Sequence, residues 1–201
     1  MIPLRSETVW QRVVSIDERL LLSVRRWESR LMTRLMRTLT HLGDAASWML
    51  LGLALGFSGA AGERDCALLG TAAGLALLIA QPLKRLCCRK RPSSGIRGFA
   101  ALAENPDVFS FPSGHTAVAF AVAAAFAGQS GPLAALALAL AVGIAVSRVY
   151  LGAHYPLDVA AGVLVGTLAG IAARLLVLEF PLLKLAGYAA LASGLPHAWI
   201  S

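Results

Sequence analysis

Long stretches without charged residues limit what this chain can fold into. Residues 45–62, 66–83 and 116–147 contain no Asp, Glu, Lys or Arg, and residues 156–178 carry charge only near their two ends. A transmembrane helix needs about 20 consecutive apolar residues, so the stretch at 116–147 is too long for one crossing. An interruption with glycine and proline at 128–132 divides it into two helices. The sequence therefore predicts five membrane-spanning helices.

The composition excludes a soluble domain. Hydrophobic residues make up 57% and charged residues 14% of the 201 residues, and the mean hydropathy is +0.69. A soluble protein carries roughly a quarter charged residues. One soluble core of this size could not bury so much apolar surface, so lipid must solvate part of it. Disordered, collagen-like and disulfide-scaffold proteins are excluded as well. The expected fold class is an all-α, polytopic membrane helix bundle.

The excess of basic residues points to the membrane surface. The net charge is +7, from 18 Lys and Arg against 11 Asp and Glu. In a soluble protein this charge would indicate a nucleic-acid partner, but here the basic residues lie outside the apolar stretches. Anionic lipid head groups are therefore the expected partner, and no nucleic acid is expected. Cys66, Cys87 and Cys88 form no Cys-x-x-Cys pair, so neither metal binding nor redox chemistry through sulfur is expected.

Residues 1–43 predict an amphipathic helix at the membrane interface. Apolar residues recur there at steps of three and four, with arginines at other positions. The recurring residues are Leu20, Val24, Trp27, Leu31, Leu35 and Leu39. Nothing indicates a cleaved signal peptide. At the other end, residues 180–201 are expected to form a second interfacial helix or a sixth span. The whole chain, 1–201, is thus predicted to be one membrane domain, with the helix bundle at 44–201.

Three glycines in the last span are spaced four residues apart. Gly162, Gly166 and Gly170 form a ridge of small residues that lets another helix approach closely. Close packing within this bundle is the main interpretation. A homodimer contact is the alternative.

Three polar motifs stand at the ends of the predicted spans. They occupy residues 84–92, 112–115 and 147–158. By counting crossings, the end of the second span, the start of the third, the end of the fourth and the start of the fifth lie on one membrane face. The three motifs, far apart in sequence, are therefore predicted to meet at one end of the bundle.

The cationic members of these motifs predict an anion site. Lys84, Arg91 and Arg148 supply positive charge, and guanidinium groups bind phosphate oxygens in bidentate fashion. Ser113 and Gly114 precede a helix, where a hydroxyl and backbone N–H groups can bind an anion. The remaining basic residues of the first motif and its loop, Arg85, Arg89, Lys90 and Arg97, are expected to be membrane anchors. In the same loop, Glu104 and Asp107 are expected to be solvated, with a substrate-gating role as the alternative.

The other members predict covalent catalysis. His154 lies four residues before Asp158, near enough for the carboxylate to accept one ring N–H and leave the other nitrogen free to attack. His115 comes from another helix and can protonate a leaving oxygen. Together with an anion site, these roles indicate phosphoryl transfer through a phosphohistidine intermediate. Two histidines with Asp158 could also bind zinc, but the surrounding cations disfavour a dication, so no metal or other cofactor is expected.

The motifs resemble those of a known family. The pattern is Lys84-x6-Arg91-Pro92, Pro112-Ser113-Gly114-His115 and Ser147-Arg148-x5-His154-x3-Asp158. It is similar to that of the type 2 phosphatidic acid phosphatase superfamily, which includes lipid phosphate phosphatases, bacterial undecaprenyl-pyrophosphate phosphatases and vanadium-dependent haloperoxidases. The resemblance implies metal-independent dephosphorylation of a lipid phosphate. It implies His154 as nucleophile, Asp158 as its orienting acid and His115 as general acid. Lys84, Arg91, Ser113, Gly114 and Arg148 would bind the phosphate. The haloperoxidases are larger and soluble, which sets this chain apart from them.

Two other functions remain open at this point: a phosphotransferase that passes the phosphoryl group to another acceptor, and a non-catalytic protein that binds anionic lipids. The sequence does not distinguish undecaprenyl pyrophosphate, phosphatidic acid and phosphatidylglycerol phosphate as substrates. The resemblance implies an active site on the periplasmic or extracellular face of the cell (inner) membrane, which is the expected face. The count of basic residues in the five-span arrangement favours the opposite face.

Overall fold

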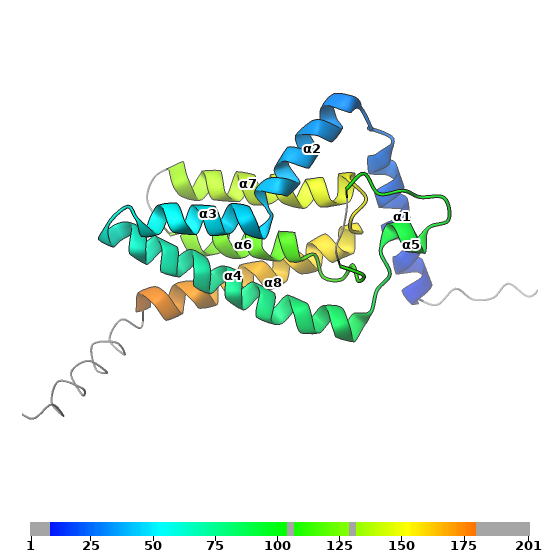
Figure 1. Ribbon diagram of the computed structural model, residues 1–201. Coiled ribbons are helices and arrows are strands. Elements are labelled where there is room, and N and C mark those ends of the chain that lie inside the picture. The colour runs from blue at the N-terminus through cyan, green and yellow to red at the C-terminus, as the bar shows by residue number, and fades with distance from the viewer. Residues whose placement is uncertain (1–8, 104–106, 129–131, 180–201) are drawn as a thin grey trace, which may run out of the picture.

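The computed structural model describes residues 9–103, 107–128 and 132–179, which form a bundle of helices (Figure 1). In chain order the helices are α1 (Val9–Arg25), α2 (Arg30–Leu42), α3 (Ala45–Gly56), α4 (Ala60–Cys87), α5 (Pro92–Gly95), α6 (Gly114–Phe126), α7 (Pro132–Tyr150) and α8 (Pro156–Arg174). One π-helical turn, η1 (Leu175–Glu179), extends α8. The all-α fold class is confirmed. Residues 180–201, for which a second interfacial helix or a sixth span is expected, lie outside the described residues.

Five apolar helices correspond to the five predicted spans. Three of them are long and apolar enough to cross a membrane: Ala60–Cys87, Leu133–Tyr150 and Pro156–Leu178. The other two, α3 and α6, have 12 and 13 residues. The predicted boundary between the first two spans is wrong, since α3 ends at Gly56 and α4 begins at Ala60. Gly59, with a φ of 88°, makes this turn earlier than the charges at 63–65 indicate.

The short helix α6 lies at the centre of the bundle, between α4, α7 and α8. Nine of its 13 residues are buried, so it need not span the roughly 30 Å of hydrocarbon by itself. The glycine ridge of α8 faces this helix. A Cβ built on Gly166 would lie 2.2 Å from the carbonyl oxygen of Ala117, and one on Gly170 would lie 2.2 Å from that of Ala121. Close packing within the bundle, the main interpretation of the ridge, is thus confirmed.

The N-terminal segment forms two helices rather than the single predicted one. A turn at residues 26–29 separates them, and the Ser29 side chain caps α2 by accepting from the Met32 N–H. The apolar stripe seen in the sequence is largely exposed, with Trp27 at 80% and Leu31 at 79%, as befits side chains that meet lipid. α1 crosses the end of the bundle, and α2 packs on α7 (Figure 1).

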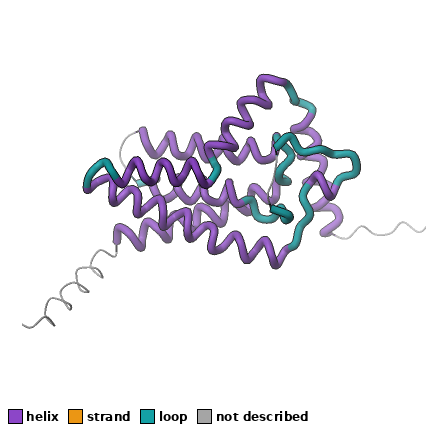
Figure 2. Tube along the Cα trace, viewed as in Figure 1, coloured by secondary structure: helices purple, strands orange, loops and turns teal. Residues whose placement is uncertain are grey.

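The long loops gather at the same end of the bundle as α1 (Figure 2). One follows α4, which ends where Cys88 adopts a left-handed backbone with φ 47°. In this loop the Lys90 and Phe109 backbones pair in an isolated bridge, and the Ser110 N–H donates to the carbonyl of Arg89. The other loop joins α7 to α8 and contains Gly152, with φ 70°. Both loops are thereby held against the ends of the central helices.

Candidate active site

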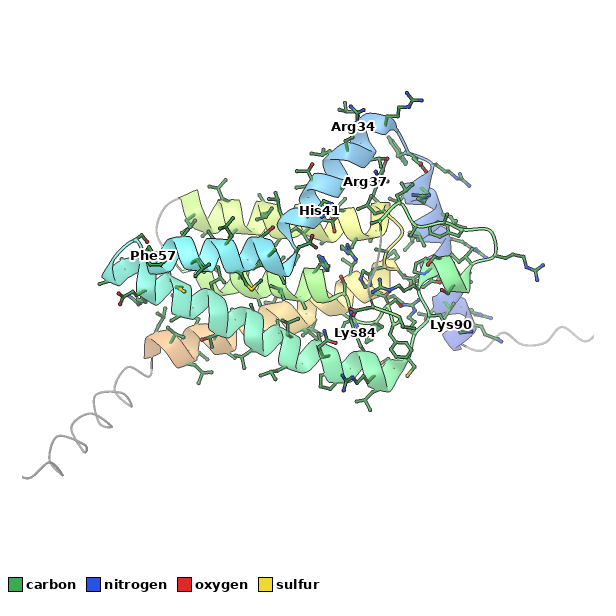
Figure 3. All side chains as sticks on the ribbon, viewed as in Figure 1. Arg34, Arg37, His41, Phe57, Lys84 and Lys90 are labelled. Carbon is green, nitrogen blue, oxygen red and sulfur yellow. The ribbon has the colours of Figure 1, made fainter. Side chains whose placement is uncertain are left out.

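The sequence-predicted site residues come together at this end of the bundle. Lys84 ends α4, Gly114 and His115 begin α6, Arg148 ends α7, and Asp158 lies in the first turn of α8. Together with Arg91 and His154 from the two loops, the first four of these residues line a single cavity of about 880 Å³. Ser113 and Asp158 are fully buried beside it. Figure 3 shows Lys84 at this end and Phe57, which lines the same cavity, at the opposite end of α3.

Three cationic side chains are buried around the polar end of the cavity. Lys84, Arg91 and Arg148 are each less than 7% exposed. The carboxylate of Asp107 pairs with the Lys84 ammonium and lies 4.0 Å from Nη2 of Arg91. Burial alone would raise the pKa of Asp107, but the neighbouring Lys84 and Arg91 outweigh it and hold that pKa below its usual value. Asp107 is thus solvated as expected, with 47% of its side chain exposed, but it also pairs with a buried cation. Glu104 lies outside the described residues.

Arg91 is fixed by the loops on both sides of it. Its Nε donates to the carbonyl of Asp107 over 2.6 Å, and its Nη1 donates to the carbonyl of Ala153 over 2.8 Å. Arg148 is held from α2, where Nη1 donates to Oγ1 of the buried Thr40 over 2.6 Å. These contacts fix where the guanidinium groups lie before any anion arrives, which reduces the cost of ordering them on binding.

His154 is 1% exposed and lies next to the cations. Its Nε2 is 3.4 Å from Nη1 of Arg91. An arginine can only donate, so Nε2 can accept from it in the tautomer that carries the proton on Nδ1. Burial, together with the positive charges of Arg148, Arg91 and Lys84, lowers the pKa of His154 well below its usual value. A neutral imidazole with a free lone pair beside an anion site has the properties of a nucleophile.

Asp158 lies behind His154, and its contacts differ from the expected ones. Its Oδ2 is 3.7 Å from Nδ1 of His154, which is longer than a hydrogen bond. Oδ2 instead accepts from the backbone N–H of Tyr155 over 2.9 Å, and Oδ1 accepts from Nη1 of Arg89 over 2.8 Å. The role of Arg89 as a simple membrane anchor is therefore wrong. Its guanidinium also lies over the Tyr155 ring, 4.2 Å from the centroid.

His115 has a carboxylate partner that the motifs do not contain. Its Nε2 lies 2.7 Å from Oδ1 of Asp44, in the short loop between α2 and α3, and Oδ2 of Asp44 lies 2.9 Å from Nδ1 of His41. Burial would raise the pKa of Asp44, but the hydrogen bonds from the two histidines lower it overall. Burial and the charge of Arg148 disfavour a protonated His115, whereas an ionised Asp44 favours the protonated form that a general acid needs.

Ser113, a predicted phosphate-binding residue, contacts two helices at this end of the bundle. Its hydroxyl lies 2.9 Å from that of Thr116, and its backbone N–H donates to the carbonyl of Asp158 over 3.0 Å. Ser113 therefore joins the start of α6 to the start of α8. Gly114 lies closer to the cations, since a Cβ built on it would be 4.0 Å from Nζ of Lys84.

Besides Asp107, other described residues for which the sequence predicts no site role contact the predicted site, among them Asp17, Thr40, Asp44 and Arg89. The positions of Asp17 and Thr40 in the sequence could have indicated their contacts. Asp17 is a carboxylate at helical spacing from the buried Leu21, and Thr40 is four residues after the buried Met36. A polar residue in the buried stripe of a helix indicates a polar partner. Asp44 and Arg89 lie in loops, where no periodicity singles them out.

Known proteins resemble this chain in sequence and in fold. The PAP2 superfamily matches residues 65–180. The decaprenylphosphoryl-5-phosphoribose phosphatase of Mycobacterium tuberculosis is 36% identical over 135 residues, covering 67% of this chain and 74% of the relative. The crystal structure of Aquifex aeolicus LpxE superposes with a TM-score of 0.69 at 27% identity, covering 77% of this chain and 92% of that one. The structure of a PAP2-type phosphatidylglycerolphosphate phosphatase from Bacillus subtilis superposes with a TM-score of 0.68 at 28% sequence identity. The match covers 81% of this chain and 85% of that one. This chain belongs to the PAP2 superfamily.

Proposed function

We propose that this protein removes the terminal phosphate of a polyprenyl or acyl lipid phosphate through a phosphohistidine on His154. Membership of the PAP2 superfamily, with relatives named as phosphatases of lipid phosphates, makes the chain a membrane-embedded lipid phosphatase. A polyprenyl tail is the favoured choice, because relatives named as phosphatases of decaprenyl and undecaprenyl compounds are among those that match.

One observation carries the proposal: the cationic site opens into an apolar trough. The cavity is lined at one end by Lys84, Arg91 and Arg148, and elsewhere by apolar side chains of α3 and α4 that run as far as Phe57. The 12 residues of α3 extend roughly 18 Å at 1.5 Å per residue. A charged head group with a long apolar tail matches both parts of this cavity, whereas a soluble phosphate would leave the trough empty.

The proposed chemistry follows from the contacts. Nε2 of His154 attacks the phosphorus atom, the bond from phosphorus to the leaving oxygen breaks, and His115 gives that oxygen a proton. Water then attacks the phosphorus atom of the phosphohistidine, and His115 takes one of the water protons. The bond from phosphorus to Nε2 breaks, so His154 is regenerated and inorganic phosphate leaves. Lys84, Arg91 and Arg148 stabilise the charge on the equatorial oxygens. Asp158 stabilises the positive charge that develops on the His154 ring.

The test is phosphate release by purified protein in detergent micelles. The panel contains decaprenyl phosphate, undecaprenyl pyrophosphate, phosphatidic acid and phosphatidylglycerol phosphate, each with and without added glycerol as acceptor. We expect stoichiometric phosphate from at least one lipid and fastest release from a polyprenyl compound. Transfer of the phosphoryl group to glycerol in place of release would favour the phosphotransferase, and binding without turnover would favour the non-catalytic lipid-binding protein.

Chelation should leave turnover unchanged. The buried cations Lys84, Arg91 and Arg148 are placed to stabilise the negative charge of the transferred phosphoryl group, as Mg²⁺ does in kinases. Phosphate release measured before and after dialysis against EDTA should therefore agree within about twofold. A loss that added Mg²⁺ or Zn²⁺ restores would contradict the proposed roles of these residues.

Replacement of Asp107 by Asn should tighten anion binding. The Asp107 carboxylate pairs with Lys84, so a phosphate must displace it, and a pair with one half-exposed partner is worth about 1 kcal/mol. Asp107→Asn should lower the KM for the lipid and the inhibition constant of inorganic phosphate roughly fivefold. The matched control is Glu63→Gln, which removes the same charge from an exposed residue in the first turn of α4 and should change neither constant. Unchanged or weaker phosphate inhibition in Asp107→Asn would contradict the displacement.

We further propose that the site lies on the periplasmic face of the inner membrane. The basic N-terminal helices are the main argument against this face, yet two of their arginines serve structural contacts with the loop after α5. Arg25 donates to the carbonyl of Ala100, and Arg37 donates to that of Leu102. Arginines bound in this way report topology poorly. The test uses a Leu86→Cys variant in which the native cysteines are replaced by serine. Intact cells are treated with a maleimide that cannot cross the membrane. We expect Cys labelling at this position, and its absence would favour the cytoplasmic face.

A further inference from the structure

A buried carboxylate lies on α1, outside the region that matches the PAP2 superfamily. Asp17 is 1% exposed, whereas the family match begins at residue 65. Burying an ionised carboxylate is costly unless charged or hydrogen-bonding partners compensate. The partners of Asp17 therefore indicate why α1 carries an acid on its buried face.

Both partners of Asp17 belong to the catalytic end of the bundle. Its Oδ1 accepts from the backbone N–H of Leu157 over 2.9 Å, and its Oδ2 accepts from Nη2 of Arg89. Leu157 lies in the first turn of α8, whose N–H groups have no partner within the helix. Asp17 thus caps α8 from another helix, next to Asp158. Figure 1 shows α1 across the end of the bundle where α8 begins.

Arg89 connects the two acids. Its Nη1 donates to Oδ1 of Asp158, while its Nη2 bonds Asp17. The side chain is only 16% exposed. Burial would lower the pKa of Arg89, but the two carboxylates raise it overall. One guanidinium therefore separates two buried carboxylates, and its planar fork bonds both at once, which a lysine ammonium does less well.

These contacts decide which oxygen of Asp158 faces the histidine. Oδ1 is bound to Arg89 and Oδ2 to the Tyr155 N–H, and with the carboxylate held in this way Oδ2 faces Nδ1 of His154, at 3.7 Å. We propose that Asp17 and Arg89 are positioning residues of the active site: Asp17 holds Arg89, and Arg89 fixes the Asp158 carboxylate behind His154. The N-terminal helix α1 then takes part in catalysis through this chain of contacts. The inference rests on the proposed function, since it assumes that His154 is the nucleophile.

The experiment uses Asp17→Asn, which keeps the shape of the side chain and an oxygen for the Leu157 N–H but removes the charge that holds Arg89. The matched control is Glu18→Gln, the same change at the next residue of α1, which is less buried. The purified full-length variants are assayed with the panel lipid that the wild type hydrolyses fastest. kcat, KM and inhibition by inorganic phosphate are measured separately, with the thermal unfolding temperature in the same detergent.

In Asp17→Asn, kcat should fall about tenfold or more, because a displaced catalytic group costs up to about a hundredfold. KM and the phosphate inhibition constant should stay within about twofold, since the cationic residues of the cavity are untouched. Glu18→Gln should match the wild type. Arg89→Lys should retain more kcat than Arg89→Met, because it keeps the charge.

Three results would overturn the positioning role. They are a wild-type kcat in Asp17→Asn, a parallel loss of kcat, anion binding and unfolding temperature, and equal effects of Arg89→Lys and Arg89→Met. A wild type that releases phosphate from no lipid of the panel would instead overturn the proposed function. The two failures are therefore distinguishable.

Discussion

Replacement of His154 by Ala should abolish turnover, lowering kcat by a factor of roughly 10³ or more. The imidazole is the only group that this change removes from the covalent route, and the cations that remain can bind the substrate but cannot form the intermediate. Substrate binding should persist, because Lys84, Arg91 and Arg148 are unchanged. The measurements are phosphate release and, separately, the affinity for inorganic phosphate by calorimetry.

A second measurement makes this prediction specific to a phosphohistidine. Phosphorylated histidine is stable in alkali and hydrolysed by acid, so an alkaline quench during turnover of a radiolabelled lipid should trap label on the wild-type protein and none on His154→Ala. Size-exclusion profiles and unfolding temperatures establish that both proteins are folded. A variant that kept more than about a tenth of the wild-type rate, or that still trapped label, would rule out His154 as the nucleophile.

The sequence predicts much of this fold because lipid imposes simple rules. A helix that crosses the bilayer must be long and apolar, so the apolar stretches locate α3, α4, α6, α7 and α8. Alternating crossings then bring the three motifs to one end before any contact is known. The sequence also predicts the close packing of α8 from its glycine ridge. Only a residue without a side chain fits at Gly166, because an added Cβ would lie 2.2 Å from a backbone carbonyl oxygen.

Some features of the fold depend on contacts between segments far apart in the chain, and the spacing of residues within one segment cannot predict such contacts. The amphipathic pattern at 1–43 indicates an interfacial location. The direction in which α1 crosses the end of the bundle depends on the hydrogen bonds of Asp17 with Arg89 and with the Leu157 N–H. Likewise, spacing alone assigns Asp158 to His154. Spacing cannot reveal that Arg89 and the Tyr155 N–H are its closer partners, because both come from loop geometry.

Vanadate should inhibit the enzyme far more strongly than phosphate does. Transfer to His154 passes through an arrangement with three equatorial oxygens and in-line attacking and leaving groups. Vanadate adopts this five-coordinate shape readily, with a histidine nitrogen as one axial ligand. A site complementary to the transition state binds such a mimic at least about a hundredfold more tightly than the ground state. We expect inhibition that is reversible, competitive with the lipid, and effective well below inhibitory phosphate concentrations.

The variants test whether the residues of the cavity act as one in-line site. Nε2 of His154 is the axial ligand, while Lys84, Arg91 and Arg148 are placed to bind the equatorial oxygens. His154→Ala should therefore lose at least about tenfold in vanadate affinity by calorimetry, while phosphate affinity changes little. Arg148→Ala should weaken the binding of both anions. Its matched control is Arg85→Ala, which removes an exposed cation from the last turn of α4 and should alter neither. Equal vanadate affinity with and without His154 would mean that the nucleophile and the cations do not converge on the same phosphorus atom.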